Sequence, residues 1–277
     1  MILTEVVALG FKKLIISIAR KISYNSLTYG IYERILWNQI KDNAMPEHIG
    51  LILDGNRRWA SERLLDPIIG HDYGAKKIEE LLEWCLKLNV KTVTMYVFST
   101  ENFTRSKREL DHIMQIAETR LKDLLTSKDI DEKRVRIKFI GRLNLLPEHV
   151  RSLMSKVEDA TKSYDKYYLN VAIAYGGRAE IVDATRKIAT EIQEGKLKPQ
   201  DITESVISKH LYTSHLPKPD PDLVIRTSGE ERLSNFLLWQ GAYSELCFLD
   251  VYWPDFRRID LWRAIRTYQL RSRRFGR

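Results

Sequence analysis

The chain has 277 residues, a hydrophobic fraction of 44% and a formal net charge of +8. This composition allows a large apolar core, and the positive charge suits acidic partners such as phosphorylated metabolites, nucleic acid or anionic lipid surfaces. Cys85 and Cys247 lie in apolar segments without metal-ligand spacing, which predicts free thiols in a reducing compartment and argues against a disulfide framework.

The first 45 residues predict a helical extension ahead of the main domain. No run reaches the roughly 18 to 20 apolar residues that a membrane span needs. The apolar stretch over 14–22 is flanked by lysine and arginine and is not followed by a cleavage site, so it is not a signal peptide. A helix there fits an anionic membrane surface and a protein surface equally well, which predicts a cytoplasmic protein with or without peripheral membrane contact. Residues 28–43 predict a second helix.

From residue 46 onward, short β-rich runs alternate with longer amphipathic runs. The predicted strands are 48–53, 91–98, 135–140, 168–174, 222–226 and 245–249. The predicted helices are 74–88, 107–126, 147–162, 178–194, 203–211 and 258–270. Because no Pro/Gly/Ser-rich linker interrupts the alternation, we expect one α/β domain over 46–277, with a mostly parallel sheet flanked by helices.

Arginine, serine, glycine and acidic residues gather where five of the predicted strands end. The segments concerned are 54–58, 98–105, 141–142, 175–178 and 226–234. In parallel sheets, ligands bind beyond the carboxyl ends of the strands. The pattern therefore predicts one ligand site along this edge of the sheet.

The segment after the first predicted strand indicates which ligand this is. Gly55 allows close approach of the backbone, and Arg57 and Arg58 can grip phosphate oxygens. Asp54 would repel phosphate unless a cation lies between them, so the set suggests Mg²⁺ with a diphosphate or a nucleotide.

Several other chemistries lack their motifs. The sequence has no P-loop, no GxGxxG after a strand, no Cys/His zinc cluster and no GxSxG elbow. A nucleic-acid binder is disfavoured because the arginines stand singly at strand ends rather than in a stripe. The residues that remain suit two diphosphate groups and Mg²⁺.

Two further features of the sequence each fit two interpretations. His71 is predicted just before the helix 74–88, where it could donate to a leaving diphosphate or cap the helix. The helix 107–126 carries Ala117 among larger apolar residues on one face, which is the pattern of ordinary core packing and also of a channel for a hydrocarbon.

From about Met45 to the C-terminus the chain resembles the cis-prenyltransferase family, which makes undecaprenyl and dehydrodolichyl diphosphates. The motifs that carry the resemblance are 53–59, 96–103, 170–178, 222–230, 234–240 and 243–246. The resemblance implies a six-stranded α/β domain, a homodimer and Mg²⁺ dependence. The implied reaction adds isopentenyl diphosphate to an allylic prenyl diphosphate, farnesyl or geranylgeranyl, and yields a long Z-polyprenyl diphosphate that becomes a glycosyl carrier lipid.

The resemblance also implies a role for each matching residue. Asp54 would organise Mg²⁺ and the allylic diphosphate, Glu245 would complete the metal site, and His71 would assist the departure of pyrophosphate. Ser99 and Asn102 match residues that orient isopentenyl diphosphate and remove its proton. Matches to the allylic diphosphate cradle and its surroundings are Gly55, Asn56, Arg57, Arg58, Trp59, Glu101, Phe103 and Arg105. Matches to the isopentenyl diphosphate site are Arg226, Arg232, Ser234 and Gly276.

The chain departs from the family pattern in three places. Phe103 replaces a common tryptophan, which should preserve an aromatic wall, and Glu231 replaces a histidine common in bacterial members. Pro67 stands where an arginine often binds the allylic phosphate, and Arg63 is the nearest substitute. The ending 274–276 is similar to archaeal and eukaryotic members.

Two rival functions follow from the resemblance. One is a shorter product or another acceptor, such as a prenylglyceryl phosphate. The other is a non-catalytic partner subunit, but such subunits lose the aspartate and the cradle that this chain retains at Asp54, Arg57 and Arg58.

Overall fold

The computed structural model describes residues 26–271, which divide into two compact units, 26–44 with 258–271 and 45–257. In the first unit, α2 (Ser26–Ile40) and α10 (Arg258–Leu270) pack through Trp37 and Trp262, whose ring centroids lie 5.6 Å apart. Both helices were expected, but α10 belongs with α2 rather than with the α/β unit. The helix predicted over 14–22 and Gly276 lie outside the described residues.

The second unit is built on a six-stranded sheet whose neighbouring strands are all parallel, which confirms the predicted α/β class. The strand order is β3-β4-β2-β1-β5-β6. The strands are β1 (His48–Ile52), β2 (Thr92–Ser99), β3 (Val135–Ile140), β4 (Tyr167–Tyr175), β5 (Leu223–Arg226) and β6 (Glu245–Phe248). Each predicted strand is confirmed to within one residue at either end.

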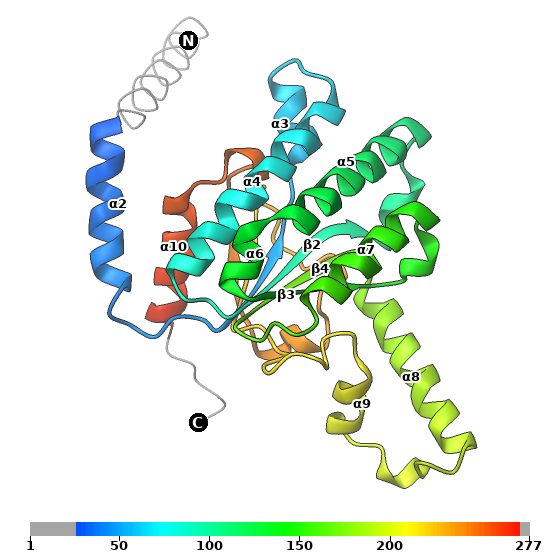
Figure 1. Ribbon diagram of the computed structural model, residues 1–277. Helices are drawn as coiled ribbons and strands as arrows, with labels where there is room; N and C mark the ends of the chain where they lie inside the picture. Colours follow the sequence, from blue (N-terminus) through cyan, green and yellow to red (C-terminus); the bar gives the residue numbers. More distant parts are fainter. Residues whose placement is uncertain (1–25, 272–277) are drawn as a thin grey trace, which may run out of the picture. The chain divides into compact units, whose positions relative to one another are not determined.

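Helices cover this sheet, and Figure 1 shows α4, α5 and α7 over one of its faces. The helices are α3 (Asn56–Glu62), α4 (Pro67–Lys87), α5 (Lys107–Thr126), α6 (Lys128–Lys133), α7 (Glu148–Thr161), α8 (Gly177–Gln193) and α9 (Glu204–His210). The predictions for α5 and α7–α9 are confirmed, whereas α3 and α6 were not predicted. Over residues 26–271, no helix combines the length and hydropathy needed to cross a membrane.

The start of α4 corrects the prediction, because the helix begins at Pro67 and not at residue 74. The carboxylate of Asp66 accepts a hydrogen bond from the backbone N–H of Ile68 at 3.1 Å and caps the first turn. Proline is well suited to the first helical position, where its missing N–H is not needed.

The two faces of the sheet have different surroundings: one lines a cavity and the other packs in the core. Leu169, Val171 and Ile173 of β4 point to one face and line a large cavity. Ala172 points to the other face and packs in a buried cluster with Phe236. Side chains alternate along a strand, so a strand buried on both faces becomes a nearly continuous apolar run.

Candidate active site

The carboxyl ends of β1, β2 and β5 lie together at one edge of the sheet. Ile52 of β1 is in register with Tyr96 of β2 on one side and with Arg226 of β5 on the other. The segments that follow these strands therefore start side by side, as the sequence predicted. Most of the predicted site residues come from these segments.

Asp54 lies between two arginines. Its Oδ2 accepts a hydrogen bond from Arg226 Nη2 at 2.8 Å and lies 3.5 Å from Arg58 Nη2, while its Oδ1 accepts from the Gly55 N–H at 2.7 Å. Burial alone would raise the pKa of Asp54, but the contacts with Arg226, Ser228 and Arg58 hold the pKa below its ordinary value. The carboxyl group is therefore ionised at neutral pH.

The turn after Asp54 requires glycine. Gly55 has a φ of 105°, and a Cβ atom there would lie 2.7 Å from the ring of Tyr252. The chain then enters α3 at Asn56, so residues 56–58 form the first turn of a helix. The Asn56 side chain rests against Gly74 of α4, and its Oδ1 has no hydrogen-bond partner among the described residues.

Arg226 joins the two predicted diphosphate sites. Only 4% of the residue is exposed, and its Nη2 holds Asp54. Its Nη1 donates to Ser234 Oγ at 2.7 Å and to the carbonyl of Arg232. Its Nε is buried and has no partner within the described part of the chain. An arginine in this state is positioned before any ligand arrives and retains a free donor.

Arg58 and Arg232 are more exposed and share an acidic neighbour. Arg58 donates to Ser228 Oγ at 2.6 Å and to Glu230 Oε1 at 3.0 Å, and its guanidinium lies 5.7 Å from the Tyr252 ring centroid. Arg232 pairs with the other oxygen of Glu230. Sequence reasoning had named both arginines but had given no role to Ser228 or Glu230.

His71 lies within α4 and not before it, which corrects the predicted place at a helix start. Its Nε2 lies 3.0 Å from Glu109 Oε1. Burial lowers the pKa of His71, although the hydrogen bond and charge of Glu109 oppose this shift. The ring is therefore neutral at neutral pH, and its Nε2 carries the proton that it donates to Glu109.

Glu109 is a site residue that the sequence did not reveal. Its side chain is 12% exposed and accepts from His71 and, at 2.9 Å, from Arg105 Nη1; Arg57 Nη1 lies 3.9 Å away. It thus gathers three cationic or donor groups, one each from α3, from α4 and from the segment that precedes α5. The one local indication is the pair Ser106 and Glu109, because Ser106 Oγ caps the N–H of Glu109 at the start of α5.

The segment after β2 is a short 3₁₀ turn over Thr100–Thr104. Asn102 accepts a hydrogen bond from the Ser99 N–H at 2.9 Å, in a reciprocal cap that holds the two predicted catalytic residues together. Both line the cavity with Glu101. The Phe103 ring instead packs edge-on against Phe98, with centroids 4.9 Å apart.

Trp59 and Arg63 do not face the site. Trp59 is buried and donates to Asp255 at 2.7 Å, and Arg63 binds the same carboxylate at 2.7 Å and lies over the Trp59 ring. Neither side chain lines the cavity. The structure therefore does not support Arg63 as the substitute for the arginine missing at Pro67.

Glu245 lies at the opposite edge of the sheet from Asp54. It begins β6 in register with Leu223, which is in register with Ile49. Ile49 precedes the carboxyl end of β1 at Ile52 by about 10 Å of strand. The structure thus does not bring the two predicted metal ligands together within one chain. Over residues 26–271, no group of three or more His, Cys, Asp or Glu side chains could hold a metal ion.

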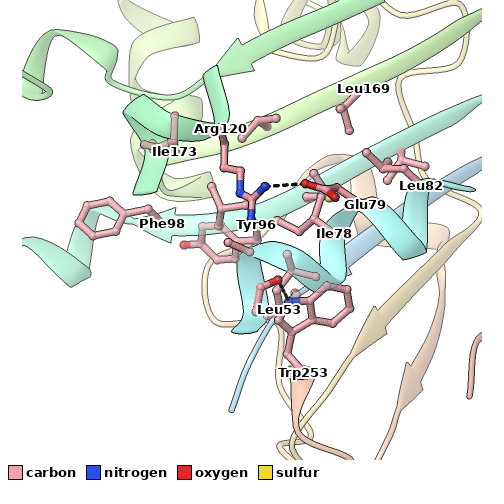
Figure 2. Close-up of a pocket in the computed structure, with 18 of the residues that line it drawn as sticks. Leu53, Ile78, Glu79, Leu82, Tyr96, Phe98, Arg120, Leu169, Ile173 and Trp253 are labelled. Carbon is pink, nitrogen blue, oxygen red and sulfur yellow. Dashed lines mark hydrogen bonds and ion pairs between the residues drawn. The ribbon is translucent and has the colours of Figure 1, made fainter. Parts of the chain in front are cut away.

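The edge of the sheet that carries these arginines opens into a large cavity of about 1600 Å³. Its walls come from α4, α5 and strands β2–β4, and Figure 2 shows apolar side chains such as Ile78, Leu82 and Leu169 around it. Ala117 lines this cavity, as do the apolar residues on the same face of α5. The site therefore combines an anion-binding mouth with a deep apolar interior.

Three comparisons with known proteins agree with this geometry. Residues 52–276 match the Prenyltransf family model, which describes undecaprenyl diphosphate synthase. The chain is 55% identical to a geranylgeranyl-diphosphate-specific tritrans,polycis-undecaprenyl-diphosphate synthase of Methanopyrus kandleri, over 90% of this chain and 91% of that protein. It is 49% identical to the Methanocaldococcus jannaschii enzyme of the same name, over 96% and 94%.

A solved structure shows the same fold. The lavandulyl diphosphate synthase of Lavandula x intermedia, in complex with dimethylallyl diphosphate, superposes with a TM-score of 0.80 at 37% identity, covering 84% of this chain and 99% of that one. The family model and the relatives each cover most of the sequence. The chain belongs to the cis-prenyltransferase family and is a prenyltransferase.

Proposed function

We propose that the protein condenses isopentenyl diphosphate repeatedly onto an allylic prenyl diphosphate to form a long Z-polyprenyl diphosphate. The observation that carries this proposal is an edge of arginines that opens directly into an apolar cavity of about 1600 Å³. A diphosphate head with a hydrocarbon tail has the same division between charge and apolar length. The relatives named above are polyprenyl diphosphate synthases, which supports the same activity.

In each cycle, the allylic C–O bond breaks and pyrophosphate leaves. C4 of isopentenyl diphosphate forms a bond to the allylic C1, and a proton leaves C2 to give the Z double bond. Arg57, Arg58 and Arg105 lie where they can stabilise the charge of the departing pyrophosphate. His71 lies beside them, but the single N–H of its neutral ring is directed to Glu109, so its Nδ1 is left as a hydrogen-bond acceptor.

The second diphosphate belongs to the other half of the edge. Arg226, Arg232 and Ser234 form a connected group that can hold isopentenyl diphosphate. Ser99 and Asn102 line the same cavity, and the family pattern assigns to them the orientation of this substrate and the removal of its proton. Asp54 connects both halves through its contacts with Arg226 and Arg58.

We infer a magnesium site at Asp54. The donor set fits, because Mg²⁺ in such sites uses one or two carboxylates together with substrate phosphate oxygens rather than a protein cage. When bound, the ion supplies positive charge that neutralises the diphosphates. The low pKa of Asp54 keeps its carboxylate ready for this role. Glu245 lies at the other edge of the sheet in the same chain, so we place no ligand there.

We further propose geranylgeranyl diphosphate as the starter. Both relatives described above are named as specific for it, and the cavity of about 1600 Å³ is large enough to receive a long tail. The homodimer, the role of Gly276 and the contact between the N-terminal helix and a membrane stay predictions.

The test is incubation of the purified protein with Mg²⁺, labelled isopentenyl diphosphate and each of four starters with 5, 10, 15 or 20 carbons. We expect a ladder of Z-polyprenyl diphosphates with the 20-carbon starter as the best substrate, and no product in EDTA. Transfer to prenylglyceryl phosphate without a ladder would support the rival acceptor. No incorporation with any starter would refute the proposal.

A further inference from the structure

The cavity-lining face of α5 carries an arginine among its apolar residues. Ile113, Ile116, Ala117, Leu121 and Leu124 repeat at helical spacing and line the cavity. Arg120 also lines the cavity and stands three residues beyond Ala117, where the periodicity predicts an apolar side chain. Asp123 lines the cavity as well, and its Oδ2 lies 3.4 Å from Arg120 Nη1.

α4 has the matching feature. Ala75, Ile78, Leu82 and Leu86 line the cavity, and so do the charged residues Glu79, Glu83 and Lys87. Arg120 Nη1 approaches Glu79 Oε1 to 2.5 Å. Figure 2 shows this ion pair among the apolar side chains of the cavity wall. Two helices thus place opposite charges on their apolar faces so that the charges meet.

Fold stability does not account for the pair. The Arg120 side chain is 32% exposed and that of Glu79 is 65% exposed, and pairs this exposed contribute little to stability. Two apolar residues at these positions would bury more apolar surface and would continue the pattern of both helices.

The position of the pair corresponds to a particular chain length. From Glu109, beside His71, α5 rises by about 16 Å to Arg120. One isoprene unit has four main-chain bonds of about 1.5 Å, or roughly 5 Å when extended. A prenyl tail of about 15 to 20 carbons that starts at the site therefore ends near the pair.

We propose that the Arg120–Glu79 ion pair is a checkpoint that the free end of the prenyl chain passes at about 15 to 20 carbons. This inference rests on the proposed function and adds a residue pair that governs tail length. Below this length the tail touches only apolar wall. At this length the tail removes water from the pair and from the neighbouring Asp123, and beyond it lie the apolar side chains of Leu121 and Leu124.

At the checkpoint, the free energies that favour and oppose advance of the tail are similar in size. Burial of one more five-carbon unit favours advance, and desolvation of the ions opposes it by an amount of similar size. The free end should pause at the pair, and starters that already extend past it should avoid the pause. Replacement of Arg120 by an apolar residue should remove the opposing contribution.

The first experiment measures binding without catalysis. Unreactive thiolo-diphosphates with geranyl, farnesyl and geranylgeranyl tails are titrated into wild-type protein and into Arg120→Leu. In the wild type, we expect the affinity gain from farnesyl to geranylgeranyl to be at least about fivefold smaller than the gain from geranyl to farnesyl, because only the longer tail desolvates the pair. In Arg120→Leu, the two gains should be equal.

The second experiment follows elongation from farnesyl diphosphate in a rapid-quench assay. Intermediates of about 20 carbons should accumulate in the wild type and fall at least about fivefold in Arg120→Leu. The exchanged pair Glu79→Arg/Arg120→Glu should restore the pause, because it keeps an ion pair at this place; it is combined with Asp123→Asn, since Asp123 Oδ2 lies 3.4 Å from Arg120 Nη1 and would repel the new glutamate. Lys122→Leu is the matched control, since its pair with Glu118 at 2.6 Å lies on α5 and neither residue lines the cavity.

Equal affinity gains in the wild type, or gains that Arg120→Leu leaves unchanged, would overturn the checkpoint. A lower thermal stability of Arg120→Leu with an unaltered ladder would also overturn it and assign a structural role to the pair. If the wild type makes no polyprenyl product from any starter, the proposed function fails, and the titrations still decide the role of the pair.

Discussion

The amino ends and the carboxyl ends of the strands form two edges of the sheet, and the polar groups at these two edges differ in how completely they are paired. At the amino edge, His48 is fully buried, with Nδ1 bonded to the Lys218 carbonyl at 3.0 Å and Nε2 to the Thr94 hydroxyl at 2.8 Å. Thr94 also accepts from Asn170, whose Oδ1 is bonded to His215. Such a network, with its groups paired inside the protein, stabilises one arrangement of the chain.

At the carboxyl edge, groups of the same kind are left partly open. Arg226 Nε and Asn56 Oδ1 are buried without partners in the described part of the chain. Ser228 and Ser234 have φ values of 80° and 47°, which non-glycine residues rarely adopt. An unpaired donor, an unpaired acceptor and backbone strain at one edge are expected where a ligand completes the structure. The amino ends of the strands therefore carry paired groups that stabilise the fold, whereas the carboxyl ends carry groups that are available to bind a ligand.

The largest effect should follow from Asp54→Asn. The amide keeps the shape and can still accept from Arg226, so the fold should persist, but the loss of charge should lower kcat about a thousandfold. Turnover at saturating Mg²⁺ and a thermal unfolding curve check both parts. Near-normal turnover would break the comparison, because the carboxyl edge would then tolerate loss of its central charge.

The next effect separates the two diphosphate sites. Arg232→Ala should raise KM for isopentenyl diphosphate, and Arg58→Ala should raise KM for the allylic substrate, each by about 10- to 100-fold. Arg226→Ala should weaken both, since Arg226 holds Asp54 and Ser234 together. Initial rates with each substrate varied in turn distinguish these outcomes. Equal effects of Arg232→Ala and Arg58→Ala on one substrate would contradict the assignment.

The sequence was sufficient for the sheet and for most of the site. Strands buried on both faces are short apolar runs with sharp ends, so their bounds were predictable. The parallel order then placed Asp54, Ser99 and Arg226 at one edge. The sequence did not show α3, because Gly55 followed by Asn56 has the composition of a loop, although Gly55 serves only as the turn into a helix.

Residues that act through spatial neighbours were not predictable. Glu109 stands in the first turn of α5, where an acidic residue is common and has no distinctive pattern. Its role is visible only in the structure, where α3 and α4 bring Arg57 and His71 to it. Glu245 shows the converse, since its motif suggested a metal ligand and the register of β6 placed it at the other edge.

A smaller effect is expected for Glu109→Gln, which tests whether a residue behind the site positions it. The variant should lower kcat by about 10-fold or more through the loss of charged hydrogen bonds to His71 and Arg105. Glu109 raises the pKa of His71, so its removal should lower that pKa and move the acid limb of the pH–rate profile to lower pH. A purely structural role would lower stability without this shift. Glu118→Gln, which removes a carboxylate of α5 that does not line the cavity, is the control.

The smallest effect on catalysis, and a distinct effect on stability, is expected at the amino edge. Burial lowers the pKa of His48 to about 4 from 6.5, against the opposing hydrogen bond to the Lys218 carbonyl. Because the folded-state pKa is depressed, the unfolded chain binds the proton more readily between these values. The folded state should therefore keep its full stability above pH 6.5 and lose about 2 kcal/mol from this group by pH 5.

His48→Gln should remove this dependence, because an amide can donate to the Lys218 carbonyl and accept from Thr94 but does not titrate. Denaturant unfolding at pH 7 and pH 5 should show a smaller loss of unfolding free energy in the variant than in the wild type, while turnover at neutral pH stays the same. His149→Gln, at an exposed histidine of α7, should leave the wild-type loss unchanged. An equal loss of unfolding free energy in His48→Gln and in the wild type would show that the paired network at the amino edge does not hold a neutral histidine. The contrast between the two edges would then rest on the carboxyl edge alone.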